Sequence, residues 1–406
     1  MISYTAHAVE LTLEEALASA LENNQEIRIA QSKVEAAGKE KISSMGNFLP
    51  TLSAAGTLMR PDQPQEMFPG AYTPDNTYNL TATAQLPLFT GGRNISLMKN
   101  ASLQKKIAEA NLLNEENKLR QRVLETFYRT LLSEKILNIQ QESEKRLRNH
   151  YKQAEILYKN GLASRFDLLR AEVQLSNLAP LILQSKNAVH SARANLALLT
   201  GIKGAKPSGQ LDYVKTDFNL EDSFKKALEN RPDLQSIELT SKMAKTAITL
   251  TRSQGLPYLA AAYNLRYDHP YQGKDEWGDS WVASLTLNIP IFRGFSTLSD
   301  TSQARAQQKQ ALLSYDLYAQ VVMLEVETAY YSLVEEEGKI EALRKTLSQA
   351  KEALSIAQTH YKNGLISNLE FMDTDLSFMQ AQVSLMTAYT EYKIAAGRLI
   401  TAVGGD

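Results

Sequence analysis

The sequence predicts a mainly α-helical chain that contributes four β-strands to a membrane sheet, and three observations predict this fold class. The chain of 406 residues is an internal tandem repeat. Each half contains two segments in which apolar and small polar residues alternate with the period of a strand. The first half also contains a very long run without a helix breaker, and a matching long helix is expected in the second half. We therefore expect the same order of helix, strand, strand, long helix and return helix twice.

Composition excludes several classes of protein. The 44 basic and 45 acidic side chains give a net charge of -1, which gives no reason to expect nucleic acid as a partner. No stretch reaches the roughly 20 apolar residues of a membrane-spanning helix. With Cys at 0 there is no disulfide, thiolate zinc site or thiol nucleophile in this sequence. The first residues lack a secretory signal, so for an exported protein we expect a mature segment with a new initiator methionine.

The repeat is clearest in a five-residue motif. Tyr158-Lys159-Asn160-Gly161-Leu162 returns as Tyr361-Lys362-Asn363-Gly364-Leu365, at an offset of 203 residues. The earlier Leu49-Pro50 returns as Leu256-Pro257 at a slightly larger offset, so the length difference lies in one loop. Such self-similarity indicates a duplicated structural unit. We expect the first repeat over residues 1–210 and the second over residues 211–406.

Helix and strand signals place the same elements in each repeat. In the first we expect a helix over 12–47, strands over 49–60 and 78–89, a long helix over 93–160 and a return helix over 165–200. In the second we expect a helix over 219–254, strands over 256–269 and 280–292, a long helix over 295–363 and a return helix over 367–403. A barrel portion would then comprise 49–89 and 256–292, and the rest would form an α-barrel and an equatorial region.

The long helices set this chain apart from a soluble sheet protein. From Asn94 to Asn160 there is neither proline nor glycine, and a helix of that run measures roughly 100 Å. Apolar residues in both long segments recur in steps of three and four, which indicates coiled-coil packing. Asn-Gly at the end of each run supplies the left-handed residue that reverses the chain. Each repeat is therefore expected to end in an antiparallel helical hairpin.

Four strands per chain fix the expected stoichiometry. A sheet with two open edges cannot lie in lipid, because its edge backbone groups would have no hydrogen-bond partners. Two chains would give eight strands, a size whose interior side chains fill, whereas three chains give 12 strands and leave a lumen. We therefore expect a homotrimer that encloses a 12-stranded barrel in outer membrane lipid.

Ordered motifs carry a family resemblance over nearly the whole chain. They are Leu11-Thr12-Leu13-Glu14-Glu15-Ala16-Leu17, Phe48-Leu49-Pro50, Gln85-Leu86-Pro87-Leu88-Phe89-Thr90-Gly91-Gly92 and both Tyr-Lys-Asn-Gly-Leu turns. With them the sequence resembles the TolC family of outer membrane efflux proteins. The resemblance implies a trimeric 12-stranded outer membrane β-barrel continuous with a periplasmic 12-helix α-barrel of long coiled-coil hairpins. It also implies docking to a periplasmic adaptor protein and an inner membrane pump of the RND, ABC or MFS class, for drug efflux or type I secretion.

The resemblance further implies a gate at the periplasmic helix tips. By position, Tyr361 resembles the gate tyrosine and Asp167 its partner. The sequence departs from the family pattern at Ile366, where well-studied members place an arginine that locks the tip; Arg170 is the candidate substitute. The adaptor would contact the turns themselves, at Asn160, Gly161, Leu162, Asn363, Gly364 and Leu365.

Two carboxylates after the second turn are the expected acidic ring. Glu370 and Asp373 resemble the ring residues of the family, and their i to i+3 spacing places both on one side of a helix. Three copies would bring six carboxylates near the axis, where they would favour cations and bind divalent ions. The alternative is an ordinary helix start whose acids complement the helix dipole.

Aromatic residues near the strand ends are expected to form membrane interface girdles rather than core. They are Phe89, Tyr258, Tyr267, Trp277, Trp281 and Phe292.

Catalysis finds no support in the sequence, so we expect no enzyme, no cofactor and no metal site. The histidines His7, His150, His190, His269 and His360 are scattered, and no H-E-x-x-H, Walker A or G-x-S-x-G motif occurs. His269 lies near Asp268, Asp275 and Asp279, which we interpret as a polar surface loop rather than a metal site.

The expected function is a passive outer membrane exit duct that extends into the periplasm. Two alternatives stay open: a duct for heavy-metal cations, and a coiled-coil scaffold outside the membrane in which the strands form a small sheet. A scaffold would stay in solution without detergent, whereas a barrel would not.

Overall fold

The structure, a computed structural model, describes the chain except for residues 1–8, 64–65, 69–70, 73 and 406. His7 lies outside the described residues. The chain divides into two compact units. The tip unit comprises Met1–Gln31, Asn111–Leu234 and Tyr318–Asp406, and the sheet unit comprises Ser32–Ala110 and Gln235–Leu317. Each unit combines segments of both sequence repeats. The two repeats therefore do not correspond to the two compact units.

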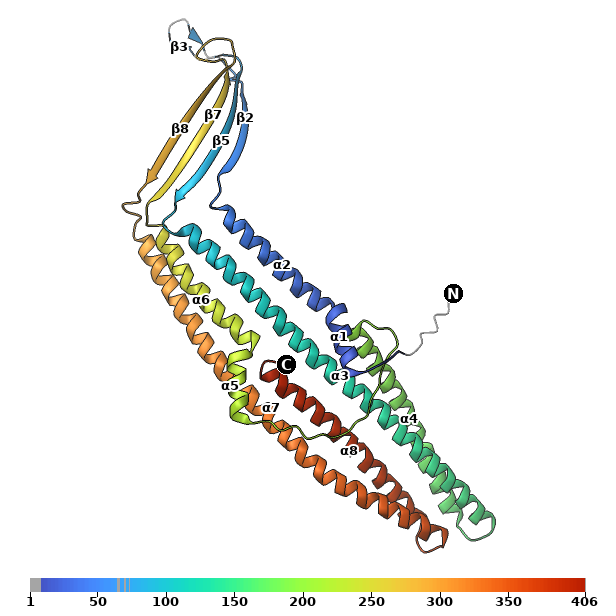
Figure 1. Cartoon of the computed structure of the whole chain (residues 1–406). Helices are drawn as coiled ribbons and strands as arrows, with labels where there is room; N and C mark the ends of the chain where they lie inside the picture. The colour runs from blue at the N-terminus through green and yellow to red at the C-terminus, as the bar shows by residue number, and fades with distance from the viewer. Residues whose placement is uncertain (1–8, 64–65, 69–70, 73, 406) are drawn as a thin grey trace. The chain divides into compact units, whose positions relative to one another are not determined.

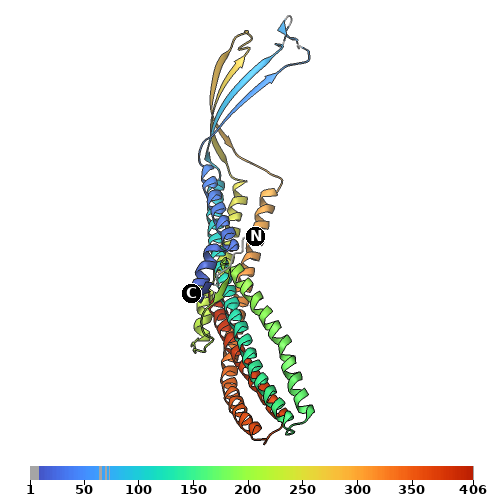
Figure 2. The ribbon, with the colours of Figure 1, turned by 90° about the vertical axis from the view of Figure 1, so that its right-hand side faces the viewer.

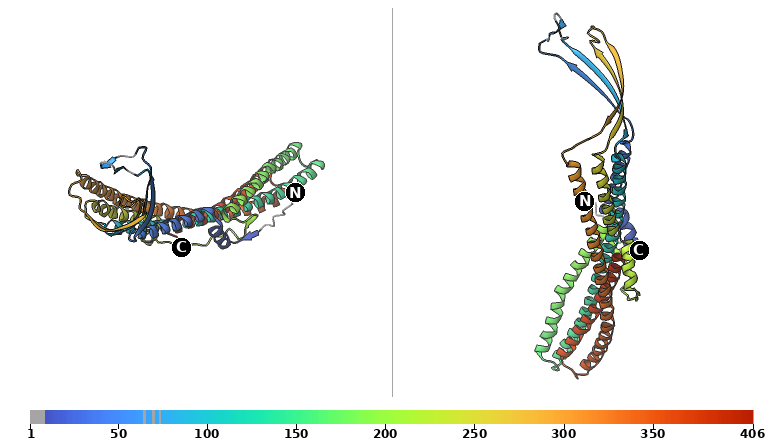
Figure 3. Two further views of the ribbon diagram at one scale, coloured as in Figure 1. Left: turned by 90° about the horizontal axis from the view of Figure 1, so that it is seen from above. Right: turned by 90° about the vertical axis from the view of Figure 1, so that its left-hand side faces the viewer.

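The sheet unit contains a four-stranded antiparallel sheet, visible in Figure 1 and in the right-hand view of Figure 3. Its strands are β2 (Thr51–Met59), β5 (Thr77–Phe89), β7 (Tyr258–His269) and β8 (Gly278–Asn288), in the order β2-β5-β7-β8. The central β5–β7 pairing joins the two repeats. The loop between β2 and β5 carries the short strands β3 (Glu66–Phe68) and β4 (Ala71–Tyr72).

The strand register separates an apolar from a polar sheet face, as the alternation predicts. Ala82 pairs with Ala54 on one side and with Leu265 on the other, so the apolar residues form rows across the strands. On the opposite face the Thr83 hydroxyl donates to Asn264 Oδ1 at 2.8 Å, and the Asn79 amide donates to the Asp268 carboxylate. The sheet therefore has one face suited to lipid and one suited to water.

The last strand is shorter than expected. The predicted strand over 280–292 ends at Asn288 in the structure. Pro290 follows two residues later, and a proline has no backbone N–H to donate to a neighbouring strand. Residues 289–292 therefore belong to the connection to the next helix.

Both helices that precede the strands are broken, which corrects the single helices expected over 12–47 and 219–254. Asn24 and Arg231 have extended backbones, with φ and ψ of -70° and 132° and of -66° and 119°. Arg231 precedes Pro232, whose ring disfavours a helical residue before it. The Asn24 side chain accepts the Glu26 N–H at 2.8 Å and so closes a local turn. The resulting helices are α1 (Leu13–Asn23), α2 (Gln25–Gly46), α5 (Leu220–Asn230) and α6 (Pro232–Ser253).

The long helices match their expected positions closely. They are α3 (Arg93–Lys159) and α7 (Ser296–Lys362), each of 67 residues, followed by the return helices α4 (Arg165–Thr200) and α8 (Asn368–Ala402). Among the described residues, no helix combines the length and the apolar character that crossing a membrane requires.

Equivalent residues of the two repeats build two hydrophobic cores in the tip unit. The first contains Leu119, Val123 and Leu196, and the second contains Val322, Val326 and Leu399 at equivalent positions. Residues of α1 join the first core and residues of α5 join the second. The duplicated sequence therefore packs as duplicated structure. A pairing that the sequence did not predict closes the first core, where β1 (Val9–Leu11) lies parallel to β6 (Ala205–Pro207).

Candidate functional site

The turns of the two helical hairpins end in the same backbone motif. Gly161 and Gly364 have φ of 72° and 70°, which the left-handed turn requires. The Leu162 N–H donates to the Leu157 carbonyl at 2.8 Å, and the Leu365 N–H donates to the His360 carbonyl at 2.9 Å. These bonds satisfy carbonyl groups that a helix end otherwise leaves free. Figures 1 and 2 show the two turns at the same end of the tip unit.

Each return helix starts with a capping box built by equivalent residues. The Asp167 N–H donates to Ser164 Oγ at 3.1 Å, and the Glu370 N–H donates to Ser367 Oγ at 3.2 Å. In return, each carboxylate accepts the serine backbone N–H and hydroxyl. The Ser367 backbone and hydroxyl bonds lower the pKa of Glu370. Asp167 and Glu370 therefore each cap their own helix.

Tyr361 lies in an aromatic cluster, where burial raises its pKa and the Asp167 charge raises it further. The ring is 8% exposed, and its centroid lies 4.5 Å from that of His150 and 5.6 Å from that of Phe371. Within the described residues no hydrogen bond joins Tyr361 to Asp167, and the Asp167 charge acts on Tyr361 only by disfavouring its phenolate form. Ile366 packs against the same cluster, at the position where the family resemblance leads one to expect an arginine.

Arg170 does not replace that arginine in this structure. Its guanidinium lies over the ring of Phe166 on its own helix, 5.6 Å from the centroid. In the part of the chain that the structure describes, Arg170 forms no ion pair. Arg170 is therefore not part of a tip lock within this chain.

Two polar links that the sequence analysis missed join α3 to α8. His150 Nε2 bonds to Asn368 Oδ1, and the Asn368 amide donates to the Asp167 carbonyl at 2.8 Å. Further along, the buried Asp375 accepts Arg146 Nε at 2.5 Å and the Ser143 hydroxyl at 2.7 Å. These links hold the first hairpin against the second.

A signal for these residues is present in the sequence. His150 follows Leu147 by three residues and precedes Ala154 by four, and all three are buried. A polar residue within an otherwise apolar coiled-coil stripe marks a specific partner. The partner itself lies on another helix, so sequence spacing does not name it.

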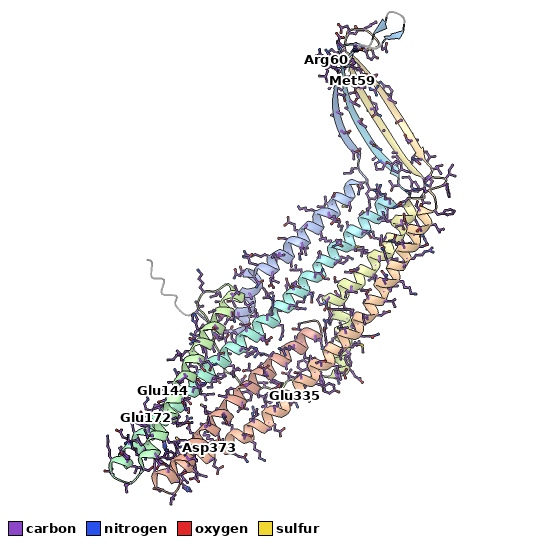
Figure 4. The ribbon with its side chains drawn as sticks, turned by 180° about the vertical axis from the view of Figure 1, so that it is seen from behind. Met59, Arg60, Glu144, Glu172, Glu335 and Asp373 are labelled. Atoms are coloured by element: carbon purple, nitrogen blue, oxygen red, sulfur yellow. The ribbon has the colours of Figure 1, made fainter. Side chains whose placement is uncertain are left out.

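The predicted ring residues differ in their surroundings. Glu370 and Asp373 are both exposed. Asp373, labelled on α8 in Figure 4, has no hydrogen-bond or ion-pair partner among the described residues. Both carboxylates are open to solvent and so can bind cations without breaking a tertiary contact.

The predicted aromatic girdle divides between the two faces of the sheet. Tyr267 stacks on Trp277 with centroids 5.0 Å apart, and Trp281 stacks on Tyr263 at 5.9 Å. Tyr258 is different, because its register with Asn288 places it on the polar face.

The other two girdle residues are placed by local irregularities. A register shift between Pro87 and Phe89 brings Phe89 opposite Leu259, on the apolar face. Phe292 lies beyond β8 and packs edge to face on Phe295 at 5.5 Å. The apolar face thus gains Phe89 but not Tyr258.

The loop histidine makes one contact with an acidic side chain. His269 Nε2 lies 3.3 Å from Asp275 Oδ1. Among the described residues no group of three or more histidine, aspartate or glutamate side chains is arranged to hold a metal ion.

Comparison with known proteins decides the family. The sequence model of the family described as "Outer membrane efflux protein" matches residues 16–202 and 224–405. The chain belongs to the outer membrane efflux protein family. It is 23% identical over 412 residues to the probable efflux pump outer membrane protein TtgC of Pseudomonas putida, covering 97% of this chain and 83% of that protein. It is 21% identical over 404 residues to the alkaline protease secretion protein AprF of Pseudomonas aeruginosa, covering 94% and 82%.

Solved structures agree on the fold. The CmeC outer membrane channel of Campylobacter jejuni superposes with a TM-score of 0.86 at 16% identity, covering 97% of this chain and 85% of that one. The predicted fold class is confirmed: this outer membrane efflux family protein has a four-stranded sheet per chain, a tandem repeat and the fold of trimeric outer membrane channels. Its place is the outer membrane.

Proposed function

We propose that three copies of this chain form a passive exit duct of a tripartite efflux or type I secretion system. The duct expels small molecules such as drugs, or proteins, to the exterior. It performs no chemistry of its own and binds no cofactor, so the driving energy comes from an inner membrane pump of the RND, ABC or MFS class. A periplasmic adaptor protein contacts the helix turns and joins the pump to the duct.

The single observation that carries this proposal is the two-faced, open-edged sheet. Among the described residues, β2 and β8 each pair on one side only. Unpaired strand edges require partners in lipid, and further copies of the same chain supply them. The polar face, with Asn79, Asn264 and Asp268, then lines a hydrated lumen, and the apolar face meets lipid.

The gate of the duct is proposed at the helix turns. Tyr361, buried in its aromatic cluster, and Asp167, which caps the start of α4, hold the tip. Glu370 and Asp373 form the acidic constriction. Carboxylate rings select cations in narrow pores. Arg170 remains exposed there and is a candidate contact to a neighbouring copy.

The test is reconstitution of the detergent-purified protein in planar bilayers, with native mass measurement of its stoichiometry. We expect trimers that insert and conduct ions in discrete steps. The Tyr361→Phe plus Asp167→Ala variant is expected to conduct more, since its tip is loosened. A protein that stays soluble without detergent and never inserts would refute the duct and favour the scaffold.

A further inference from the structure

His150 is a buried titratable residue that the proposed gate does not use. It is 4% exposed in the interior of α3, in a stripe whose neighbours Leu147 and Ala154 are apolar. A buried polar side chain is costly unless it is hydrogen-bonded. Its contacts therefore indicate why it is there.

The His150 side chain, which belongs to α3, contacts α7 and α8 directly and is connected to α4 through Asn368. Its ring stacks on Phe371 of α8, with centroids 4.1 Å apart and planes at 16°, and lies 4.5 Å from the ring of Tyr361 of α7. Its Nε2 bonds to Asn368 Oδ1 at the start of α8. The Asn368 amide continues to the Asp167 carbonyl on α4, at 2.8 Å. Asn368 is itself 4% exposed, so water does not compete for these bonds.

The link breaks the internal repeat. The positions equivalent to His150 and Asn368 in the other repeat hold Ala353 and Arg165, although the turns between them repeat the same five residues. The His150–Asn368 contact therefore occurs only where the first hairpin meets the second, among the described residues. Formation of the turns themselves does not require it, because the other repeat forms the same turn without these residues.

We propose that His150 and Asn368 form an acid-released latch, which holds the α3–α4 hairpin against the α7–α8 hairpin and lets go when the imidazole is protonated. The latch rests on the proposed function, because it regulates the gate placed at these turns.

The charges around the ring leave the neutral imidazole favoured. From α8, Asp375 faces it, but Arg146 of α3 already pairs with that carboxylate at 2.5 Å. From α4, the Asp167 carboxylate is engaged in its own capping box. From α7 the neighbour is the neutral phenol of Tyr361. Neither Asp375 nor Asp167 is therefore free to pair with an imidazolium.

Burial lowers the pKa of His150, although the Asn368 hydrogen bond and the Asp375 charge act in the opposite direction. Separation of the hairpins would expose the ring to water and return its pKa toward the ordinary value of about 6.5. The separated state then binds protons more tightly, so acid favours opening. The equilibrium between closed and separated hairpins begins to shift as pH falls below about 6.5. It changes about tenfold for each pH unit between the two pKa values.

The experiment is the open probability of single channels in planar bilayers between pH 8 and pH 5. The wild type should open more often as pH falls. His150→Gln keeps a donor for Asn368 but does not titrate, so its open probability should stay low and flat. His360→Gln is the matched control, because His360 is an exposed histidine beside the same turn and should keep the wild-type response. Free carboxylates titrate near pH 4 and lie outside this window.

A second variant keeps the test decisive if His150→Gln does not assemble into trimers. Asn368→Leu leaves the imidazole among its rings but removes the amide bridge, so it should raise the open probability already at pH 8. A wild-type pH response in His150→Gln, or loss of that response in His360→Gln, would overturn the latch. If Asn368→Leu matched the wild type while Glu370→Ala plus Asp373→Ala altered conductance, the latch would fail and the proposed gate would stand.

Discussion

Asp167 and Glu370 occupy equivalent positions in the two repeats, and each closes a capping box on the return helix that follows its turn. The carboxylates that resemble gate residues thus also fix the first turn of their helices. A change at either residue therefore alters both charge and local helix stability. Variants of the partner serines separate these two effects.

Removal of the serine hydroxyls should loosen the turns without a change of charge. Ser164→Ala and Ser367→Ala are each expected to cost about 1 kcal/mol of local helix stability. Faster backbone hydrogen exchange should appear over the first turns of α4 and α8 respectively. Ser302→Ala, which removes an exposed hydroxyl inside α7, is the control and should leave both turns protected. Unchanged exchange in both cap variants would contradict the capping role.

The cap at α8 should also respond to acid in a defined direction. The pKa of Glu370 is lowered in the folded chain. Its contribution to the stability of the helix start is therefore fully present above the pKa of the unfolded chain, about 4.3, and is lost as pH falls through the pKa of the folded chain. Protection of the first turn of α8 against hydrogen exchange, relative to the intrinsic exchange rate at each pH, should therefore be high at pH 5 and fall below about pH 4. Ser367→Ala should have fast exchange already at pH 5.

The break between α5 and α6 is stabilised by a partly buried ionic network. Arg231 donates to Asp233 at 2.6 Å and to Glu325 at 2.6 Å, and the Tyr318 hydroxyl donates to Asp233 at 2.8 Å. Burial raises the pKa of Tyr318 to about 12, together with its bond to Asp233. Burial alone would raise the pKa of Asp233, but its bonds to Arg231 and Tyr318 outweigh this and lower it.

Arg231→Met should destabilise the tip unit by about 3 kcal/mol, because it leaves the partly buried Asp233 without its cation. Thermal unfolding in detergent checks this. Arg398→Met is the control: Arg398 is exposed and lies 3.4 Å from Glu125, so its loss should cost less than about 1 kcal/mol. Equal losses in the two variants would contradict the buried role of Arg231.

The turn from β5 into α3 depends on one glycine. Gly91 has φ of 59°, and a Cβ there would lie 2.7 Å from the Leu256 Cβ. Gly91→Ala therefore combines a strained backbone, which costs about 1–2 kcal/mol, with a steric overlap that must displace Leu256. Its neighbour Gly92 has φ of 83° but open space around it, so Gly92→Ala should show the backbone cost alone. Comparison of trimer yield and thermal unfolding separates the two contributions.

The sequence predicts local structure and duplication better than it predicts tertiary partners. A breaker-free run locates α3 to within one or two residues, and the repeat locates α7 as closely. Asn-Gly locates both turns, because this signal acts within a few residues of chain. The break at Pro232 was readable by the same rule but was missed. The β1–β6 pairing and the His150–Asn368 link join distant segments, and no local pattern encodes them.

Side-chain direction on the strands is predictable only while the register stays regular. Alternation correctly separates the apolar row through Ala82 from the polar row through Thr83. It fails at Phe89, where a register shift turns the side chain to the other face. Tyr258 was grouped with the girdle by residue type alone, whereas the pairing with Asn288 places it on the polar face.

The most direct test of the gated duct is single-channel conductance of the wild type and of Glu370→Ala plus Asp373→Ala during titration with divalent cations. Both residues are exposed, so the double change removes two charges and the capping bonds of Glu370 but no tertiary contact of the tip unit. The account predicts small, cation-selective steps in the wild type that divalent cations block, and larger steps in the variant that resist block. Equal sensitivity of the two proteins to divalent cations would contradict an acidic constriction at these helix turns.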